Sequence, residues 1–124
     1  MSETISVEKL IPNPAEMPAG SAAERFSRAW VYYGLADYDA AAADFRALVE
    51  DQPQNAEYLF GLGMALKTGS ITGAREAFEK ALQHAAEIPN LRVSNVITRL
   101  ALAQLHHLET GEWNLEELPW EFYQ

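Results

Sequence analysis

The feature that most constrains the fold of this chain is an internal repeat, in which two stretches match when the sequence is shifted by thirty-three positions. Within each copy the apolar residues recur at the three-and-four spacing of one helical face. A period of this size, with helical spacing inside each copy, is typical of stacked helix hairpins that bury their apolar faces against one another. The shift superimposes, in order, Phe26, Ala29, Tyr33, Tyr38, Ala41 and Phe45 on Leu59, Leu62, Leu66, Ile71, Ala74 and Phe78.

Helix-starting and helix-breaking residues divide the centre of the chain into five expected helices. Ser21 begins a capping-box pattern that starts the first helix, and a break at 35–37 separates this helix from the second. Asn55 is expected to cap the third helix, Gly69 to provide a left-handed turn before the fourth, and 91–108 to form the fifth. The predicted fold class is therefore all-α, with about two and a half helix hairpins.

The two ends of the chain differ from its centre. Several prolines make residues 1–20 an expected extended arm, residues 21–118 form the expected helical domain, and residues 119–124 form an aromatic tail. The tail either covers the unfinished third hairpin or docks on another molecule, such as a second copy in a homodimer. Both alternatives remain open from the sequence. The large side chains of the tail are Trp120, Phe122 and Tyr123.

The repeat resembles the tetratricopeptide repeat (TPR) family. The pattern of that family asks for a small residue at Gly63, for alanine at Ala74 and Ala81, and for phenylalanine at Phe78, and the second copy has them all. In the first copy, Trp30 stands where close approach of the helices requires a small residue. The resemblance implies a right-handed superhelical stack whose concave face, built from the first helix of each hairpin, holds a peptide.

The resemblance also implies which residues contact a partner protein or peptide. Because the expected face contains apolar side chains, the partner is expected to be partly hydrophobic. Alternatively, those apolar side chains pack on the arm or the tail of the same chain. The partner-binding residues expected on the concave face are Arg28, Val31, Phe60, Met64, Lys67, Arg99, Leu102 and His106.

The likeness leaves the biological role of the module open between two interpretations. The first is an adaptor or scaffold for protein–protein interaction. The second rests on the stretch 58–63, which is similar to the central repeat of the TPR-type (class II) chaperones of type III secretion systems. That weaker likeness implies a chaperone for a hydrophobic client protein.

Composition limits the partners and the compartment. The chain has 124 residues, of which 48% are hydrophobic, and this is enough for one core. A net charge of −9 disfavours nucleic acid and anionic membrane surfaces as partners. The chain has no cysteine, which excludes disulfides and thiolate metal sites. Without a signal-peptide pattern or a stretch of transmembrane length, we expect a cytoplasmic protein with no membrane association.

No arrangement of residues in the sequence indicates catalysis, so we expect a protein that is not an enzyme and that needs no cofactor or metal. The alternative is a metal-dependent regulator or enzyme that uses His106 and His107. Adjacent residues on a helix point about 100° apart, however, so two neighbouring imidazoles do not readily bind one ion. His84 is expected to be a partly exposed surface residue.

Overall fold

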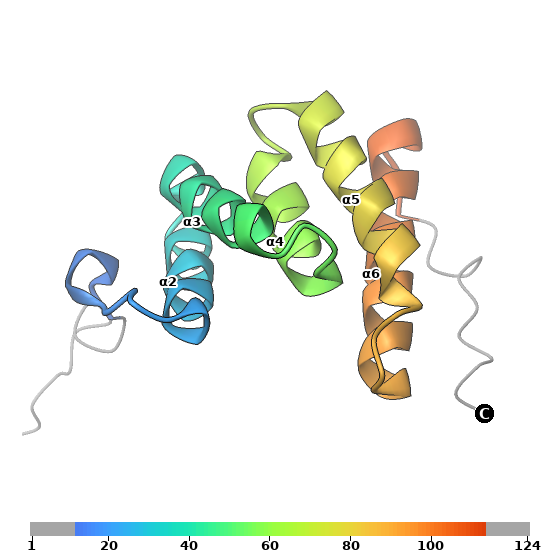
Figure 1. Ribbon diagram of the computed structural model, residues 1–124. Coiled ribbons are helices and arrows are strands. Elements are labelled where there is room, and N and C mark those ends of the chain that lie inside the picture. Colours follow the sequence, from blue (N-terminus) through green and yellow to red (C-terminus); the bar gives the residue numbers. More distant parts are fainter. Residues whose placement is uncertain (1–11, 114–124) are drawn as a thin grey trace, which may run out of the picture.

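The computed structural model describes residues 12–113, and this part of the chain contains five α-helices and one short 3₁₀ turn (Figure 1). The all-α prediction is confirmed for this part of the chain. Residues 1–11 of the expected arm at 1–20 lie outside the described residues. So do residues 114–124, which include the expected tail at 119–124. In chain order the elements are η1 (Pro14–Glu16), α2 (Ala22–Gly34), α3 (Tyr38–Asp51), α4 (Ala56–Leu66), α5 (Ile71–Ala85) and α6 (Leu91–Thr110).

Every α-helix in the described range begins at a side chain that caps it. Ser21 accepts a hydrogen bond from the backbone N–H of Glu24, whose carboxylate accepts one from the N–H of Ser21, so the predicted capping box is present. Asn55 accepts from the N–H of Tyr58 at 3.1 Å and starts α4 as predicted. Such caps satisfy backbone donors that a helix leaves without partners at its first turn. The remaining N-caps are Asp37, Ser70 and Asn90.

The helices pack as successive pairs in chain order. Helix α2 lies against α3 and α4 against α5, while α6 packs on α5 and begins a third pair (Figure 1). The first helices also contact one another, because α4 touches both α2 and α6. The turn η1 contacts α2 at the N-terminal end of the stack. The first helices α2, α4 and α6 therefore lie next to one another along the stack.

Two phenylalanines on the second helices anchor the core. Phe45 of α3 and Phe78 of α5 are the largest side chains with no exposed surface. Helix α4 fits between them because it has glycine at both contact points: a Cβ at Gly61 would lie 2.3 Å from the Phe45 ring, and one at Gly63 would lie 2.6 Å from the Phe78 ring. Such distances are far below van der Waals contact, so the helix could approach this closely only with hydrogen at these positions.

The loops between the helices differ from the prediction. Among the described residues, positive φ angles occur at Ala36, with φ 62°, and at Gly111, with φ 77°. The prediction of a left-handed turn at Gly69 was wrong, because the α4–α5 connection turns without one. Gly111 ends α6 in the left-handed conformation that glycine adopts most easily.

The period of the repeat is not the same for the two helices of a pair. The caps Asp37 and Ser70, which start the second helices α3 and α5, keep the shift that is visible in the sequence. The caps Ser21 and Asn55, which start the first helices α2 and α4, lie one position further apart. The α4–α5 connection compensates for this difference because it is shorter. Gly63 and Ala74 are one residue closer in the sequence than the corresponding Ala29 and Ala41 of the first pair.

Contacts between aromatic rings confirm the longer period of the first helices. We call this period the cap spacing, because it superimposes the N-cap Ser21 on the N-cap Asn55. The Phe26 and Phe45 ring centroids are 6.0 Å apart, and those of Phe60 and Phe78 are 5.6 Å apart. Phe26 therefore corresponds to Phe60 rather than to Leu59. By the cap spacing Ala29, which has no exposed surface, is the small residue that corresponds to Gly63. The prediction that Trp30 takes this place was wrong by one residue.

Candidate functional site

Three of the expected contact residues lie on one side of α4, at spacings of four and three residues. Phe60 is only 8% exposed and packs on Phe78, so it forms the floor of this side rather than a free contact. Met64 and Lys67 are half-buried. Burial lowers the pKa of the Lys67 ammonium. The accessible part of this side of α4 is thus centred on Met64 and Lys67.

The side of α2 that corresponds to this surface is aromatic. By the cap spacing, Phe26, Trp30 and Tyr33 correspond to Phe60, Met64 and Lys67. All three rings are half-buried. Trp30 and Tyr33 meet edge to face with ring centroids 5.5 Å apart, an arrangement that aromatic rings favour. The sequence analysis missed these rings, although aligning the two N-caps would have revealed them.

Arg28, which we expected on the concave face, is part of the first helix pair instead. Its guanidinium donates two hydrogen bonds to the Asp44 carboxylate of α3, from Nε at 2.8 Å and from Nη2 at 2.5 Å. The bond to Asp44 raises the pKa of the guanidinium. Because Asp44 is only 6% exposed and its carboxylate is paired with the Arg28 guanidinium, this ion pair joins α2 to α3. As a partner contact, Arg28 stays a prediction.

Val31 lies on a different side of α2 from the three rings. It corresponds to Ala65 by the cap spacing, and Ala65 belongs to the core between α4 and the first pair. On α2, Val31 follows Trp30 directly and so lies about 100° around the helix from it. Val31 is half-buried there and does not share a side with Phe26, Trp30 and Tyr33.

The orientation of α6 follows from the residues that face α5. The Ser94 hydroxyl donates to the Ala85 carbonyl at 2.8 Å, and Ile97 packs with Ala85. Ile97 and Ala101, both buried, face the preceding pair as Gly61 and Ala65 do on α4. We therefore align α6 with α4 by superimposing Gly61 on Ile97. The shift between these two residues is longer than the cap spacing.

This alignment defines the side of α6 that continues the surface of α4. Val96, Leu100 and Ala103 correspond to Phe60, Met64 and Lys67. Val96 is 42% exposed and Leu100 is 41% exposed, so two large apolar side chains lie open to solvent on this side of α6. We call the combined surface the α2–α4–α6 face: Phe26, Trp30 and Tyr33 on α2, Phe60, Met64 and Lys67 on α4, and Val96, Leu100, Ala103 and His107 on α6.

The three residues of α6 that we expected to contact a partner lie on another side of that helix. In the same alignment Arg99 corresponds to Gly63, and Leu102 corresponds to Leu66. Gly63 faces α5, the second helix of its own pair. Arg99, Leu102 and His106, all half-buried, are thus on the side where a second helix of the third pair would pack. As partner contacts, these three residues stay predictions.

Trp113 joins the ends of α4 and α6. Its ring stacks on the His107 imidazole with centroids 3.9 Å apart and an angle of 22° between the planes. The Lys67 ammonium lies 5.2 Å from the centre of the Trp113 ring, within the range of a cation–π interaction. Trp113 is 49% exposed. It therefore closes one end of the α2–α4–α6 face.

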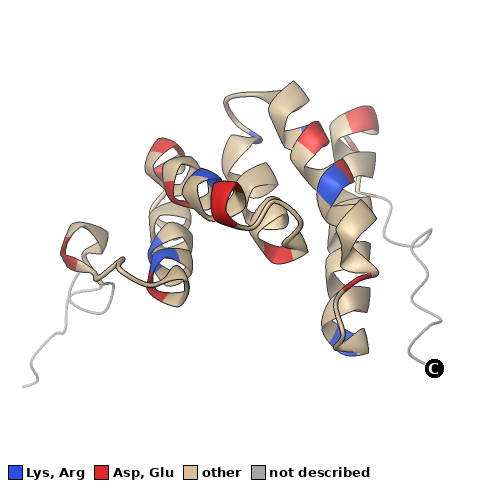
Figure 2. Cartoon of the chain, in the orientation of Figure 1, with Lys and Arg blue, Asp and Glu red and all other residues tan. Residues whose placement is uncertain are grey.

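Neither a metal site nor a membrane-crossing helix is present in the described residues. Between residues 12 and 113, no group of three histidine, aspartate or glutamate side chains is placed to hold a metal ion. His84 lies 3.2 Å from the Glu87 carboxylate, and His107 stacks on Trp113. None of the helices in this range has the length and apolar character that a membrane crossing requires. Acidic and basic positions are interspersed along these helices (Figure 2).

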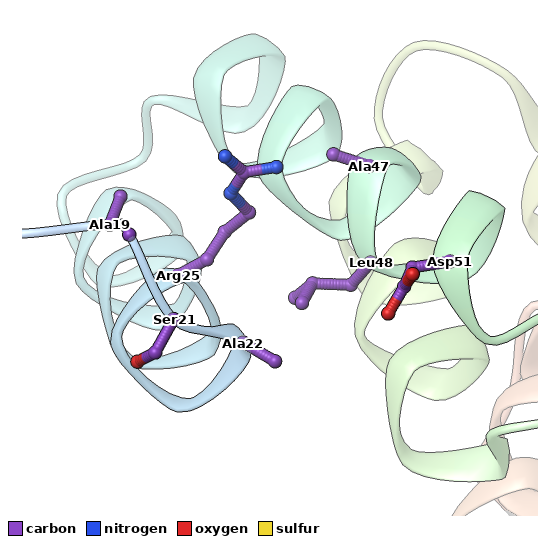
Figure 3. Close-up of a pocket in the computed structure, with 8 residues that line it drawn as sticks. Ala19, Ser21, Ala22, Arg25, Ala47, Leu48 and Asp51 are labelled. Carbon is purple, nitrogen blue, oxygen red and sulfur yellow. The ribbon is translucent and has the colours of Figure 1, made fainter.

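A small hollow lies between the start of α2 and the end of α3. It has a volume of about 250 Å³, and Leu48 of α3 points into it between Arg25 and Asp51 (Figure 3). The other walls are small side chains of 19–22 and Ala47. A space of this size, with one cation and one anion at its edge, does not define a site for a protein segment. The α2–α4–α6 face is the larger continuous surface with exposed apolar side chains.

The pairs of helices and their shared apolar face define a helical-repeat protein, a class whose stacked units present an extended surface. The model of the tetratricopeptide repeat family matches residues 26–90, just over half of the chain. The chain therefore belongs to the tetratricopeptide repeat family. Domains of this family generally mediate protein–protein interactions and are typically not catalytic. No curated protein and no solved structure matched the chain.

Proposed function

We propose that the protein is a non-catalytic adaptor that binds a segment of a partner protein on the α2–α4–α6 face. The observation that carries this proposal is the row of apolar and aromatic side chains that crosses three adjacent helices and ends in the exposed Val96 and Leu100. Exposed apolar residues that form a continuous surface mark interaction sites more often than singly scattered ones do.

The chemistry of the face favours a partner segment with apolar anchors. Trp30 and Met64 provide polarizable surface that adapts to differently shaped apolar groups. Lys67 is the cation on this face, and burial lowers its pKa, so a carboxylate of the partner placed beside it would favour its charged form. We therefore expect a segment with two or more large apolar residues and an acidic residue near one end.

The test of this proposal has two steps. A photoreactive amino acid in place of Met64 is used to crosslink and identify a partner from the native host, and the affinity of that partner is then measured by calorimetry. We expect Met64→Glu and Leu100→Glu each to weaken binding at least about tenfold, which corresponds to about 1.4 kcal/mol. Phe60 is not a suitable position, because its burial makes a charged substitution a test of folding.

The matched control is Ile71→Glu. Ile71 is 57% exposed at the start of α5, outside the α2–α4–α6 face, so this variant adds the same charge to an exposed apolar position. Its affinity should equal that of the unmodified protein. If Ile71→Glu weakens binding while Met64→Glu and Leu100→Glu do not, the site lies elsewhere and the proposal is wrong.

A further inference from the structure

The α2–α4–α6 face has two edges of different chemistry. The helices α2, α4 and α6 all run upward in the view of Figure 1, so the first residues of the face lie at one edge and the last residues at the other. The first edge is apolar and consists of Phe26, Phe60 and Val96. The other edge holds Tyr33 and Lys67, whose side chains donate hydrogen bonds. A partner that matches this face therefore differs in chemistry from one flank to the other.

The face carries one positive charge and no negative charge. The chain has eighteen acidic residues, but none of the ten residues of the face is aspartate or glutamate. The Lys67 ammonium lies 5.2 Å from the centre of the Trp113 ring, and no carboxylate of residues 12–113 pairs with it. In a chain of net charge −9, this edge is therefore complementary to an acidic group of a partner.

The width of the face matches the width of a helix. The face comprises positions within residues 26–33 of α2, 60–67 of α4 and 96–103 of α6, a width of about 10 Å at 1.5 Å per residue. An α-helix with its side chains is about 10 to 12 Å across. An extended segment is narrower, because neighbouring strands lie about 5 Å apart. An extended segment across the three helices would therefore cover one edge and leave the other in water.

Building on the proposed function, we propose that the bound segment is an amphipathic α-helix that crosses α2, α4 and α6. Its apolar stripe lies on Trp30, Met64 and Leu100, and an acidic flank lies against Lys67. Adjacent helices are about 8 to 10 Å apart, so the outer two axes are separated by roughly 16 to 20 Å. A helix of about fourteen residues spans this distance.

A helix with a basic flank is the alternative with the opposite charge. The net charge of −9 attracts such a helix over long distances and repels an acidic one. At the contact, however, the basic flank would lie beside the Lys67 ammonium, and like charges repel. A preference for the acidic helix can therefore arise only from the local contact with the face, and not from the charge of the whole chain.

The test uses the full chain and three synthetic peptides of about fourteen residues. Two are stapled helices with the same leucine stripe, and they differ only in having glutamates or lysines along one flank. The third has the residues of the acidic helix, with two central prolines and no staple, so that it cannot form a helix. Fluorescence anisotropy of a dye on each peptide measures binding. The acidic helix should bind about threefold or more tightly than the basic helix, and about tenfold or more tightly than the proline peptide.

A charge reversal tests the contact with Lys67. In Lys67→Glu, the basic helix should bind more tightly than the acidic helix, because the charge at this edge is inverted. The matched control is Lys80→Glu, which changes the net charge equally at an exposed position of α5, outside the face. This control should keep the preference for the acidic helix. A reversal in both variants would overturn the proposal, because it would show that the net charge decides.

Other results would also overturn the proposal. Tighter binding of the proline peptide would show that the face takes an extended segment, and tighter binding of the basic helix to the unmodified protein would contradict the acidic flank. So would the absence of binding by all three peptides up to about 1 mM, or amide NMR shifts centred outside Trp30, Met64 and Leu100. The crosslinking test at Met64 does not use these peptides, so the proposed function can hold where the helix proposal fails.

Discussion

At the scale of single residues, two glycines and one partly buried ion pair govern the contacts between neighbouring helices. Gly61 and Gly63 bring the backbone of α4 against the Phe45 and Phe78 rings. Arg28 and Asp44 join α2 to α3 through two short hydrogen bonds. A small change in any of these side chains should therefore alter the stability of a contact between two helices.

Gly61→Ala should destabilise the protein by about 1 to 3 kcal/mol, because the added methyl group would overlap the Phe45 ring. The free energy of unfolding in urea measures this effect. Gly34→Ala is the control, since a Cβ at Gly34 meets no atom within 4 Å. That control should stabilise by about 0.4 to 1 kcal/mol through the lower entropy of the unfolded chain. Equal effects at both positions would contradict the close contact.

Arg28→Met should lower the free energy of unfolding by about 2 to 3 kcal/mol, because it leaves the Asp44 carboxylate buried without its cation. Replacing both residues, with Arg28→Met and Asp44→Leu, should cost less than Arg28→Met alone. Urea unfolding of the two single variants and the double variant gives the coupling between them. A purely additive result would show that the pair does not act as a unit.

Tyr33 should make stability depend on pH above the ordinary tyrosine pKa of about 10. Burial, and then the neighbouring Tyr38, raise the pKa of Tyr33, so the folded protein holds the phenol proton more tightly than the unfolded chain does. The resulting stability is present below pH 10 and is lost as the pH rises through the folded pKa. Tyr33→Phe should reduce this loss of stability, as measured by urea unfolding between about pH 9 and 11. If the slope of the unfolding free energy against pH is unchanged in the variant, Tyr33 is not the cause.

At the scale of helices, most of the fold could be predicted from the sequence. The apolar spacing, Ser21 and Asn55 give the helices and two of their starts. The orientation of each helix could not be predicted as well, because the period of the first helices is longer than the visible repeat and lengthens again at α6. A shift of one residue turns a helix face by about 100°, so the alignment decides the side on which Arg28, Val31, Arg99, Leu102 and His106 are placed. As partner contacts these five residues stay predictions.

The start of α4 was predicted correctly and depends on Asn55. Asn55→Ala should lower the free energy of unfolding by about 1 kcal/mol, because the N–H of Tyr58 loses its partner. Gln54→Ala is the neighbouring control in the same connection and should change stability by no more than about 0.5 kcal/mol. Thermal unfolding followed by circular dichroism measures both. Similar losses for both variants would show that the cap is not the cause.

At the scale of the whole molecule, the protein is a short stack with unequal ends. The N-terminal end is covered by η1 against α2, whereas the other end is α6, whose second helix is absent from the described residues. Each pair contributes to the core mainly by contact with its neighbours, so the stability of the stack depends on both interfaces of α4. The apolar face crosses all three first helices, and this arrangement suits it to a partner segment that spans the stack.

The net charge of −9 should make stability depend on salt. Self-repulsion of the folded chain weakens when ions screen it, so the unfolding temperature should rise between about 0.01 M and 0.15 M NaCl, where the screening length falls from about 30 to 8 Å. KCl should act equally, because screening does not depend on the identity of the cation. An unfolding temperature that falls with salt would indicate that attractive ion pairs dominate.

The stack of Trp113 on His107 gives this protein an intrinsic optical signal. An indole in contact with an imidazole and close to an ammonium emits less light than an indole in water. In a chain with phenylalanine at Trp30 and Trp120, emission would come from Trp113 alone. Its brightness would then report, without any added dye, whether the C-terminal end of the binding surface is closed or released.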